Sequence, residues 1–265
     1  MHTVSRDADI FCQLLGDGPP VVLLHPFPTH HHFWLPVADL LASRYRLLLP
    51  DLRGHGESTA GDGPATMPKH AADIARVCDA AGVGRAVFAG VSIGGYILFE
   101  FWRRYPERVA ALILANTKAG ADTEEGRLAR LRSADEAEAH GTEPFFQSML
   151  PKFMGETTRS TRPDLVESAL RMMRRMTAPA LAAIQRGMAE RPDSFPTLKT
   201  IKVPTLVIAG EEDTLTPREE QERIQQGIVG SRLEVIARAG HYAPFEQPEA
   251  AGRLLRSFLD SLNIG

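Results

Sequence analysis

Short apolar runs alternate with longer amphipathic segments along most of this 265-residue chain. Such runs are typical of strands buried on both faces, because a strand with one wet face alternates apolar and polar residues. We expect strands at residues 21–24, 45–49, 86–89, 109–115, 205–209 and 233–236. Helices are expected at residues 33–43, 68–81, 93–104, 217–227 and 246–262. This order, preceded by a hairpin of residues 3–6 and 10–15, predicts an α/β fold with a mostly parallel sheet flanked by helices.

The alternation stops between residues 118 and 196, where no strand-like run occurs. Helical patterns are separated there by Gly, Pro and Thr, and they occupy residues 127–140, 143–154, 164–176 and 178–191. A helical insertion between two strands is best placed over the strand ends. We therefore expect a core formed by residues 1–117 and 197–265, with a helical lid (cap) formed by residues 118–196.

The motif Gly90-Val91-Ser92-Ile93-Gly94 lies between a predicted buried strand and a predicted helix. In this context Gly-x-Ser-x-Gly is typical of a nucleophile elbow, a turn so tight that it needs glycine beside the serine. The turn exposes the Ser92 hydroxyl at the strand end and directs the Ile93 N–H into the same space. The motif also arises by chance, so its meaning depends on a base and an acid elsewhere in the chain.

Asp213 and His241 are the predicted acid and base. Each follows a predicted strand, at the edge where a parallel sheet gathers its functional groups. An imidazole accepts a serine proton near neutral pH, and a carboxylate holds that imidazole in the required tautomer. We therefore predict a catalytic triad of Ser92, Asp213 and His241, in the chain order of α/β-hydrolases. Glu211, Glu212 and Asp122 are weaker candidates for the acid.

Two further blocks, His25-Pro26-Phe27-Pro28 and residues 51–58, accompany the elbow and the loops of the predicted acid and base. With these blocks the chain resembles the lid-bearing serine esterases of the α/β-hydrolase superfamily, and most of all the 3-oxoadipate enol-lactonase-like branch. That branch usually has glycine where this chain has Pro26. The resemblance implies that the backbone N–H of Phe27 joins that of Ile93 in an oxyanion hole, and that residues 51–58 buttress the fold.

The predicted activity is cofactor-free hydrolysis of a carboxylic ester or lactone through an acyl-enzyme. Two alternatives use the same triad: perhydrolysis of the haloperoxidase type, and hydrolysis of a C–C bond or an amide. A third alternative, of another class, is a receptor-like module that binds a ligand on a hydrolase scaffold. Dehalogenase and epoxide hydrolase activities are disfavoured, because those enzymes use Asp where this chain has Ser92.

The substrate pocket is expected where the lid meets the core. Phe146, Met149 and Phe153 belong to an amphipathic stripe of the lid that packs on the core, and such side chains also suit an adaptable apolar pocket. Trp34 and Tyr96 are close in sequence to the oxyanion loop and the elbow, which favours a place in the core or in the pocket. The pattern predicts a small-to-medium apolar or aromatic acyl group.

Composition narrows the partners and the compartment. A net charge of −3 without a basic stripe argues against nucleic acid, and the apolar runs are too short to cross a membrane. Cys12 and Cys78 are expected to be free thiols, and the absence of a signal-peptide pattern predicts a cytoplasmic protein. Three adjacent histidines, His30-His31-His32, are expected not to converge on one ion, so no metal site is predicted. The pattern makes no prediction of the oligomeric state.

Overall fold

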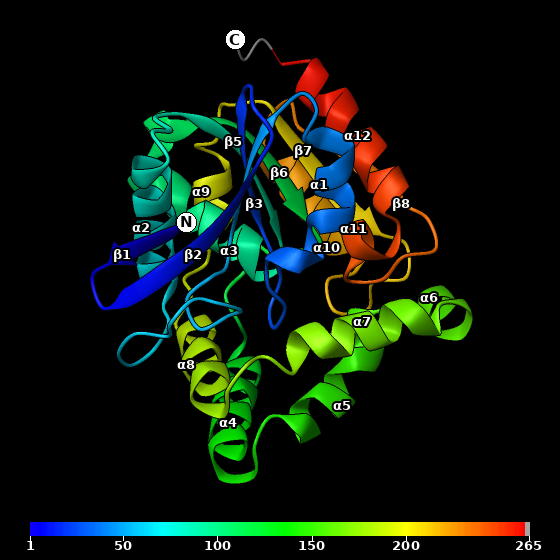
Figure 1. Cartoon of the computed structure of the whole chain (residues 1–265). Coiled ribbons are helices and arrows are strands. Elements are labelled where there is room, and N and C mark those ends of the chain that lie inside the picture. The colour runs from blue at the N-terminus through cyan, green and yellow to red at the C-terminus, as the bar shows by residue number, and fades with distance from the viewer. Residues whose placement is uncertain (263–265) are drawn as a thin grey trace.

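The computed structural model describes residues 1–262 and contains an eight-stranded sheet within them (Figure 1). The strands are β1 (His2–Ser5), β2 (Ala8–Leu15), β3 (Pro20–Leu24), β4 (Arg46–Pro50), β5 (Ala86–Val91), β6 (Val109–Ala115), β7 (Thr205–Gly210) and β8 (Arg232–Ile236). Their order across the sheet is β1-β2-β4-β3-β5-β6-β7-β8. The β1–β2 and β2–β4 pairs are antiparallel, whereas all pairs from β4 to β8 are parallel. The predicted α/β class and the N-terminal hairpin are confirmed.

Helices cover both faces of the sheet (Figure 1). The core helices are η1 (His31–Phe33), α1 (Leu35–Leu41), α2 (Met67–Ala80), α3 (Ile93–Arg104), η2 (Pro106–Arg108), α9 (Phe195–Leu198), α10 (Arg218–Gly227), α11 (Ala243–Glu246) and α12 (Pro248–Asp260). Helix α2 packs beside α3, and α1 packs beside α12 on the opposite face. The central strands are buried throughout, because each is covered by helices on both sides; every residue of β5 and β7 is buried.

A helical segment separates β6 from β7 and lies beyond one end of the sheet (Figure 1). It contains α4 (Glu124–His140), α5 (Glu143–Phe153), α6 (Glu156–Thr161), α7 (Pro163–Met173) and α8 (Ala178–Ala189). Helices α4 and α8 pack side by side. Helix α6 was not expected from the sequence. We call this segment, within the residues 118–196 proposed above, the lid.

The last predicted helix is present with shorter bounds. Residues 246–262 were expected to be helical, whereas α12 spans Pro248–Asp260 and Glu246 is the last residue of the short α11. The break is at Gln247, whose φ of −131° and ψ of 64° are not helical. The residue before a proline is disfavoured in the helical region, and Pro248 follows Gln247. Within residues 1–262, no helix is long and apolar enough to cross a membrane.

Candidate active site

The elbow around Ser92 is a strained junction between β5 and α3. Ser92 has φ 56° and ψ −114°, a conformation that costs a non-glycine residue about 1–3 kcal/mol. A Cβ on Gly90 would lie 2.5 Å from the carbonyl carbon of Gly94, so only glycine fits there. The Thr117 hydroxyl donates to the Ser92 carbonyl oxygen at 2.7 Å and ties the elbow to the end of β6. The serine side chain is thereby presented at the carboxyl edge of the sheet.

Asp213 and His241 meet at the same edge, because they follow the neighbouring parallel strands β7 and β8. His241 Nδ1 lies 2.9 Å from Asp213 Oδ2. The same carboxylate oxygen accepts a hydrogen bond from Asn116 Nδ2 at 2.8 Å, and also from the hydroxyl of Thr216. The backbone N–H groups of Leu215 and Thr216 donate to Oδ1 at 2.9 and 3.0 Å. The carboxylate is therefore held from several sides.

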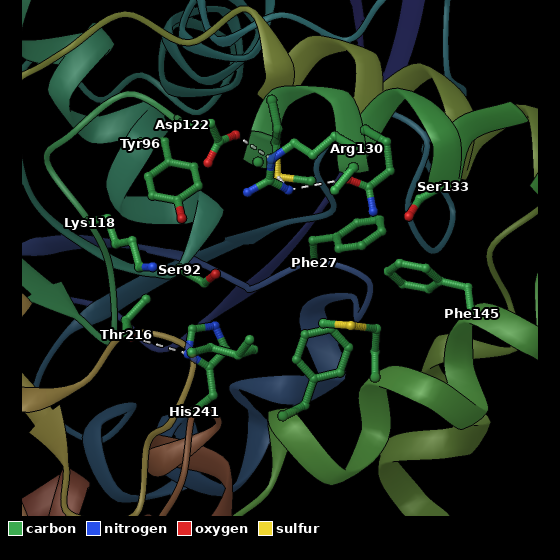
Figure 2. Close-up of a pocket in the computed structure, with 17 residues that line it drawn as sticks. Phe27, Ser92, Tyr96, Lys118, Asp122, Arg130, Ser133, Phe145, Thr216 and His241 are labelled. Atoms are coloured by element: carbon green, nitrogen blue, oxygen red, sulfur yellow. Dashed lines mark hydrogen bonds and ion pairs between the residues drawn. The ribbon is translucent and has the colours of Figure 1, made fainter. Parts of the chain in front are cut away.

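These contacts determine the charge of Asp213. Burial alone would raise the pKa of this carboxyl, but the positive charge and hydrogen bond of His241, together with Thr216, outweigh it and bring the pKa below its usual range. In the neutral imidazole, a hydrogen bond from Nδ1–H to the ionised Asp213 favours the tautomer in which Nε2 is the acceptor. Figure 2 shows the imidazole beside the Ser92 hydroxyl, and both side chains line one cavity. This arrangement suits proton transfer from serine to histidine.

The backbone N–H groups predicted to form an oxyanion hole belong to Ile93, which follows Ser92 in the chain, and to Phe27, which lines the same cavity as Ser92. Ile93 is the first residue of α3, where the helix leaves its N–H groups without intrahelical partners. Phe27 follows β3 and lines the cavity, and its carbonyl oxygen accepts a hydrogen bond from the Tyr242 hydroxyl at 3.1 Å. Within residues 1–262, neither the Phe27 nor the Ile93 N–H donates to a protein acceptor.

The loop after β4 supports the loop that carries Phe27. His25 Nε2 accepts a hydrogen bond from the Leu52 N–H at 2.9 Å. Asp51 accepts hydrogen bonds from the backbone N–H groups of His31 and Glu57 at 2.7 and 2.9 Å. Desolvation by burial raises the pKa of Asp51, but its hydrogen bond from His31 and the nearby histidines lower it to about 2 overall. Both carboxylate oxygens are thus used to join two loops of the chain.

A cavity of about 270 Å³ lies between the carboxyl edge of the sheet and the lid. Its lining comes from the core, from α4 and α8, and from α5: Phe27, Ser92, Tyr96, Lys118, Asp122, Gly126, Ala129, Arg130, Ser133, Phe145, Met149, Phe153, Gln185, Met188, Leu215, Thr216 and His241. The predicted pocket residues Tyr96, Met149 and Phe153 are among them.

Two predicted pocket residues, Trp34 and Phe146, do not line the cavity. Trp34 is 1% exposed and packs edge-on against Phe33, next to the start of α1. Phe146 is fully buried, and the cavity is lined instead by its neighbour Phe145. Phe145, Met149 and Phe153 are four residues apart on α5 and share a face, whereas Phe146 is rotated from it by about 100°. The sequence indicated the stripe but not which side faces the cavity.

The polar lining residues were also missed. Lys118, Arg130 and Gln185 come from the end of β6, from α4 and from α8. They meet only because the lid folds back over the strand ends, and no local pattern indicates that meeting. A weak signal exists for Lys118, since it lies three residues after β6, at the edge where site residues gather.

The three adjacent histidines gather more closely than expected. The candidate ligand atoms of His30, His31 and His32 all lie within 4.8 Å of one another, in the turn at η1. The expectation that neighbouring imidazoles would diverge was therefore wrong in its geometry. Two of these rings already have protein partners: His31 Nδ1 lies 2.8 Å from Asp51 Oδ1, and His30 Nδ1 accepts the His32 N–H at 3.4 Å. Through the contact of His31 with Asp51, the cluster helps to join the loop after β3 to the loop after β4.

The chain is similar to known proteins over most of its length. The family model of the alpha/beta hydrolase fold matches residues 19–248. The chain is 29% identical to 3-oxoadipate enol-lactonase 1 of Acinetobacter baylyi, over 99% of this chain and 97% of the relative. It is also similar to the structure of a thermophilic esterase from Thermogutta terrifontis with malate bound, at 35% identity and a TM-score of 0.95, covering 98% of this chain and 97% of that one.

A further solved structure supports the fold alone. The enol-lactonase from Burkholderia xenovorans is 24% identical, with a TM-score of 0.92, and the match covers 98% of this chain and 100% of that chain. The matched region of the family model includes the elbow, both loops of the acid and base, and the whole lid. The chain therefore belongs to the α/β-hydrolase fold family.

Proposed function

We propose that this protein hydrolyses carboxylic esters or lactones through an acyl-enzyme formed on Ser92. The observation that carries the proposal is the contact of buried Asp213 with His241 at 2.9 Å, because the His241 side chain lines the same cavity as the strained Ser92. The similarity to an enol-lactonase and to an esterase, each along nearly the whole chain, supports this substrate class.

In the first half of the reaction, His241 Nε2 takes the hydroxyl proton while Ser92 Oγ attacks the carbonyl carbon. The negative charge that develops on the carbonyl oxygen is held by the N–H groups of Phe27 and Ile93. Each such donor contributes about 3–4 kcal/mol to the stabilisation of the transition state in comparable sites. His241 then gives the proton to the departing alkoxide, and the alcohol leaves the acyl-enzyme.

In the second half, water attacks the acyl-enzyme while His241 accepts a proton from it, and His241 returns this proton to Ser92 Oγ as the acid departs. Asp213 stays ionised and stabilises the imidazolium formed in both halves. A lactone follows the same steps, except that the alcohol stays covalently attached to the acyl group, so that the product is a single hydroxy acid.

The proposal is tested with p-nitrophenyl acetate and butyrate. We expect wild type to release p-nitrophenol and the Ser92→Ala variant to lose at least about a thousandfold in kcat, because the nucleophile is absent. The Asp213→Asn variant is expected to lose a similar factor, because the amide favours the wrong imidazole tautomer. Ser160→Ala is the matched control, since Ser160 is an exposed lid serine with hydrogen bonds only within α6.

An organophosphate provides an independent readout. Diethyl p-nitrophenyl phosphate should transfer its diethylphosphoryl group to Ser92 Oγ, with release of p-nitrophenolate, and a peptide digest should locate the added mass on that residue. Full activity after complete labelling would contradict the proposal. Turnover that survives in a folded Ser92→Ala variant would do the same, and absence of any turnover in wild type would favour the receptor-like alternative.

A further inference from the structure

The backbone N–H of Phe27 and the carbonyl of Pro26 belong to one peptide group. This group is trans and planar, so its N–H and C=O point in opposite directions. Whatever fixes the direction of the Pro26 carbonyl therefore fixes the direction of the Phe27 N–H. Phe27 and Ser92 line one cavity (Figure 2), and this N–H has no protein acceptor within residues 1–262. The predicted oxyanion donor is thus controlled from the far side of its own peptide.

Three donors converge on the Pro26 carbonyl oxygen. Thr29 supplies two of them, its hydroxyl at 2.8 Å and its backbone N–H at 3.0 Å. His25 Nδ1 is the third, at 3.0 Å. Because His25 Nε2 accepts the Leu52 N–H at 2.9 Å, the neutral imidazole carries its proton on Nδ1 and donates it to the carbonyl. Burial lowers the pKa of His25 well below 6.5, which keeps the ring neutral at pH 7.

These donors act on the one backbone rotation that remains free at Pro26. The proline ring holds φ at about −65°, so ψ of Pro26 alone turns the peptide that carries the Phe27 N–H. His25 and Thr29 are 0% and 1% exposed, and water therefore does not compete for the carbonyl. Donors on a carbonyl also polarise its peptide, which strengthens the N–H of the same peptide as a donor.

The peptide after Phe27 is held separately, by the Tyr242 hydroxyl, which donates to the Phe27 carbonyl oxygen at 3.1 Å. Tyr242 fixes the chain beyond the predicted donor, whereas Thr29 and His25 fix the peptide that contains it. Of the three donors to Pro26, only the Thr29 hydroxyl is removed by a substitution that alters neither a ring nor the backbone. The carbonyl keeps its two other donors in that case, so the fold is expected to persist.

We propose that Thr29 is a positioning residue, whose hydroxyl orients the Phe27 N–H toward the oxyanion that forms when Ser92 attacks the substrate. The inference rests on the function proposed above, and it concerns a residue outside the cavity lining. The negative charge on the carbonyl oxygen develops in the transition state and is absent from the bound ester. Loss of the hydroxyl is therefore expected to lower kcat and to change KM little.

The test uses three substitutions at one position. Thr29→Ser keeps the hydroxyl, Thr29→Ala differs from it by one oxygen atom, and Thr29→Val keeps the shape of threonine without the hydroxyl. Hydrolysis of p-nitrophenyl butyrate gives kcat and KM for each variant. The concentration of active sites is taken from the p-nitrophenolate released in the single turnover of diethyl p-nitrophenyl phosphate. This normalisation removes the effect of a smaller folded fraction.

We expect Thr29→Val and Thr29→Ala to lower kcat by about ten- to hundredfold, because a small misplacement of a reacting or stabilising group has effects of this size. KM should stay within about twofold of wild type. Thr29→Ser should restore most of kcat. Thr205→Val is the matched control, since Thr205 is a buried threonine at the start of β7 whose hydroxyl donates to the Val203 carbonyl at 3.0 Å. Its kcat should equal that of wild type.

A transition-state analogue gives a second readout. With 1,1,1-trifluoroheptan-2-one, Ser92 Oγ adds to the ketone carbon, its proton passes to His241, and the carbonyl oxygen becomes an oxyanion in the predicted hole. The inhibition constant should rise in Thr29→Val by the factor by which kcat falls, because both depend on the same donor. An inhibition constant equal to that of wild type would contradict the inference.

The outcomes separate this inference from the function on which it rests. Ser92-dependent hydrolysis with equal kcat in Thr29→Ser and Thr29→Ala, or a loss confined to KM, would overturn the role of Thr29 and leave the hydrolase proposal standing. The absence of Ser92-dependent hydrolysis in wild type would overturn both. A Thr29→Val variant that fails to fold is recognised from its circular dichroism, and the comparison of Thr29→Ser with Thr29→Ala then decides the question.

Discussion

The carboxyl edge of the sheet and the lid form opposite walls of one cavity, but they are held by different contacts. At the sheet edge, Ser92, Asp213 and His241 are surrounded by buried strands and by short hydrogen bonds from neighbouring loops. In the lid, exposed ion pairs are common: Arg186 contacts Glu138 at 2.7 Å on the surface of α8 and α4. Exposed pairs of this kind contribute only about 0–1 kcal/mol each.

The contacts that hold the predicted catalytic groups therefore differ from the contacts that hold the part of the chain expected to select the substrate. A small change at the sheet edge disturbs several buried contacts at once, because the interior is close-packed. A change on the cavity face of the lid alters the shape offered to a substrate and few other contacts. The core is therefore expected to tolerate little variation, whereas the lid is expected to accept substitutions that retune substrate preference.

The sharpest test of this contrast is a pair of glycine substitutions. A Cβ at Gly90 would lie 2.5–2.9 Å from backbone atoms of Gly94 and Gly95, which cannot move without shifting α3. At Gly120 in the lid, the nearest heavy atom would be 3.5 Å away, on Phe195. We expect Gly90→Ala to lower the free energy of unfolding by about 3 kcal/mol, and Gly120→Ala to change it by less than about 1 kcal/mol.

Urea denaturation followed by tryptophan fluorescence measures both variants. Gly90→Ala should also reduce esterase activity, because the elbow that orients Ser92 is displaced. Equal losses of stability in the two variants would remove the contrast between core and lid. A fully stable and active Gly90→Ala variant would show that the elbow is less constrained than its contacts indicate.

The same contrast explains which parts of the molecule the sequence predicts well. Helix α3 begins and ends where the pattern placed it, at Ile93 and Arg104, because the elbow and an apolar face mark its bounds locally. The buried strands are uninterrupted apolar runs, and this pattern predicts burial on both faces from the sequence alone. Their order in the sheet was not predicted, because it depends on the crossover connections between distant strands.

The lid was harder to predict because its cavity face depends on packing between distant helices. An amphipathic stripe on α5 was apparent, but choosing between Phe145 and Phe146 requires the rotation of the helix relative to the core. The polar groups opposite this stripe come from α4 and α8, which are adjacent only in the folded chain. Asn116 was missed for a related reason, since its bond to Asp213 crosses from β6 to the loop after β7.

A second test uses the buried histidines of the core. Burial brings the pKa of His70 well below 6.5, and burial likewise lowers the pKa of His55 to about 4. Below pH 6.5 the unfolded chain binds protons that these folded imidazoles do not. The free energy of unfolding therefore falls as the pH decreases from 6.5 toward the folded pKa. At pH 5 each such histidine lowers the free energy of unfolding by about 2 kcal/mol relative to neutral pH.

We expect His70→Leu to reduce the loss of stability between pH 7 and pH 5 by about this amount, because the variant has no imidazole to protonate on unfolding. The control is His140→Leu, which replaces an exposed histidine at the end of α4 in the lid. That substitution should leave the acid-dependent loss as it is in wild type. Urea denaturation at both pH values gives the comparison. If wild type and His70→Leu lose the same stability between pH 7 and pH 5, buried His70 is not a source of the acid-dependent loss.

The smallest expected effect is on selectivity. Met149 is half-buried on α5 and lines the cavity, so Met149→Ala enlarges the cavity beside Phe145 and Phe153 and removes only the packing of a partly buried side chain. We expect the ratio of kcat/KM for p-nitrophenyl octanoate to that for the butyrate to rise about tenfold, with a change in stability below about 1 kcal/mol. Gln147→Ala is the control, because Gln147 is exposed on the same helix, lies outside the cavity lining and donates a hydrogen bond to Glu143 one turn away. A variant that loses stability while keeping its chain-length preference would show that this part of the lid serves packing rather than substrate choice.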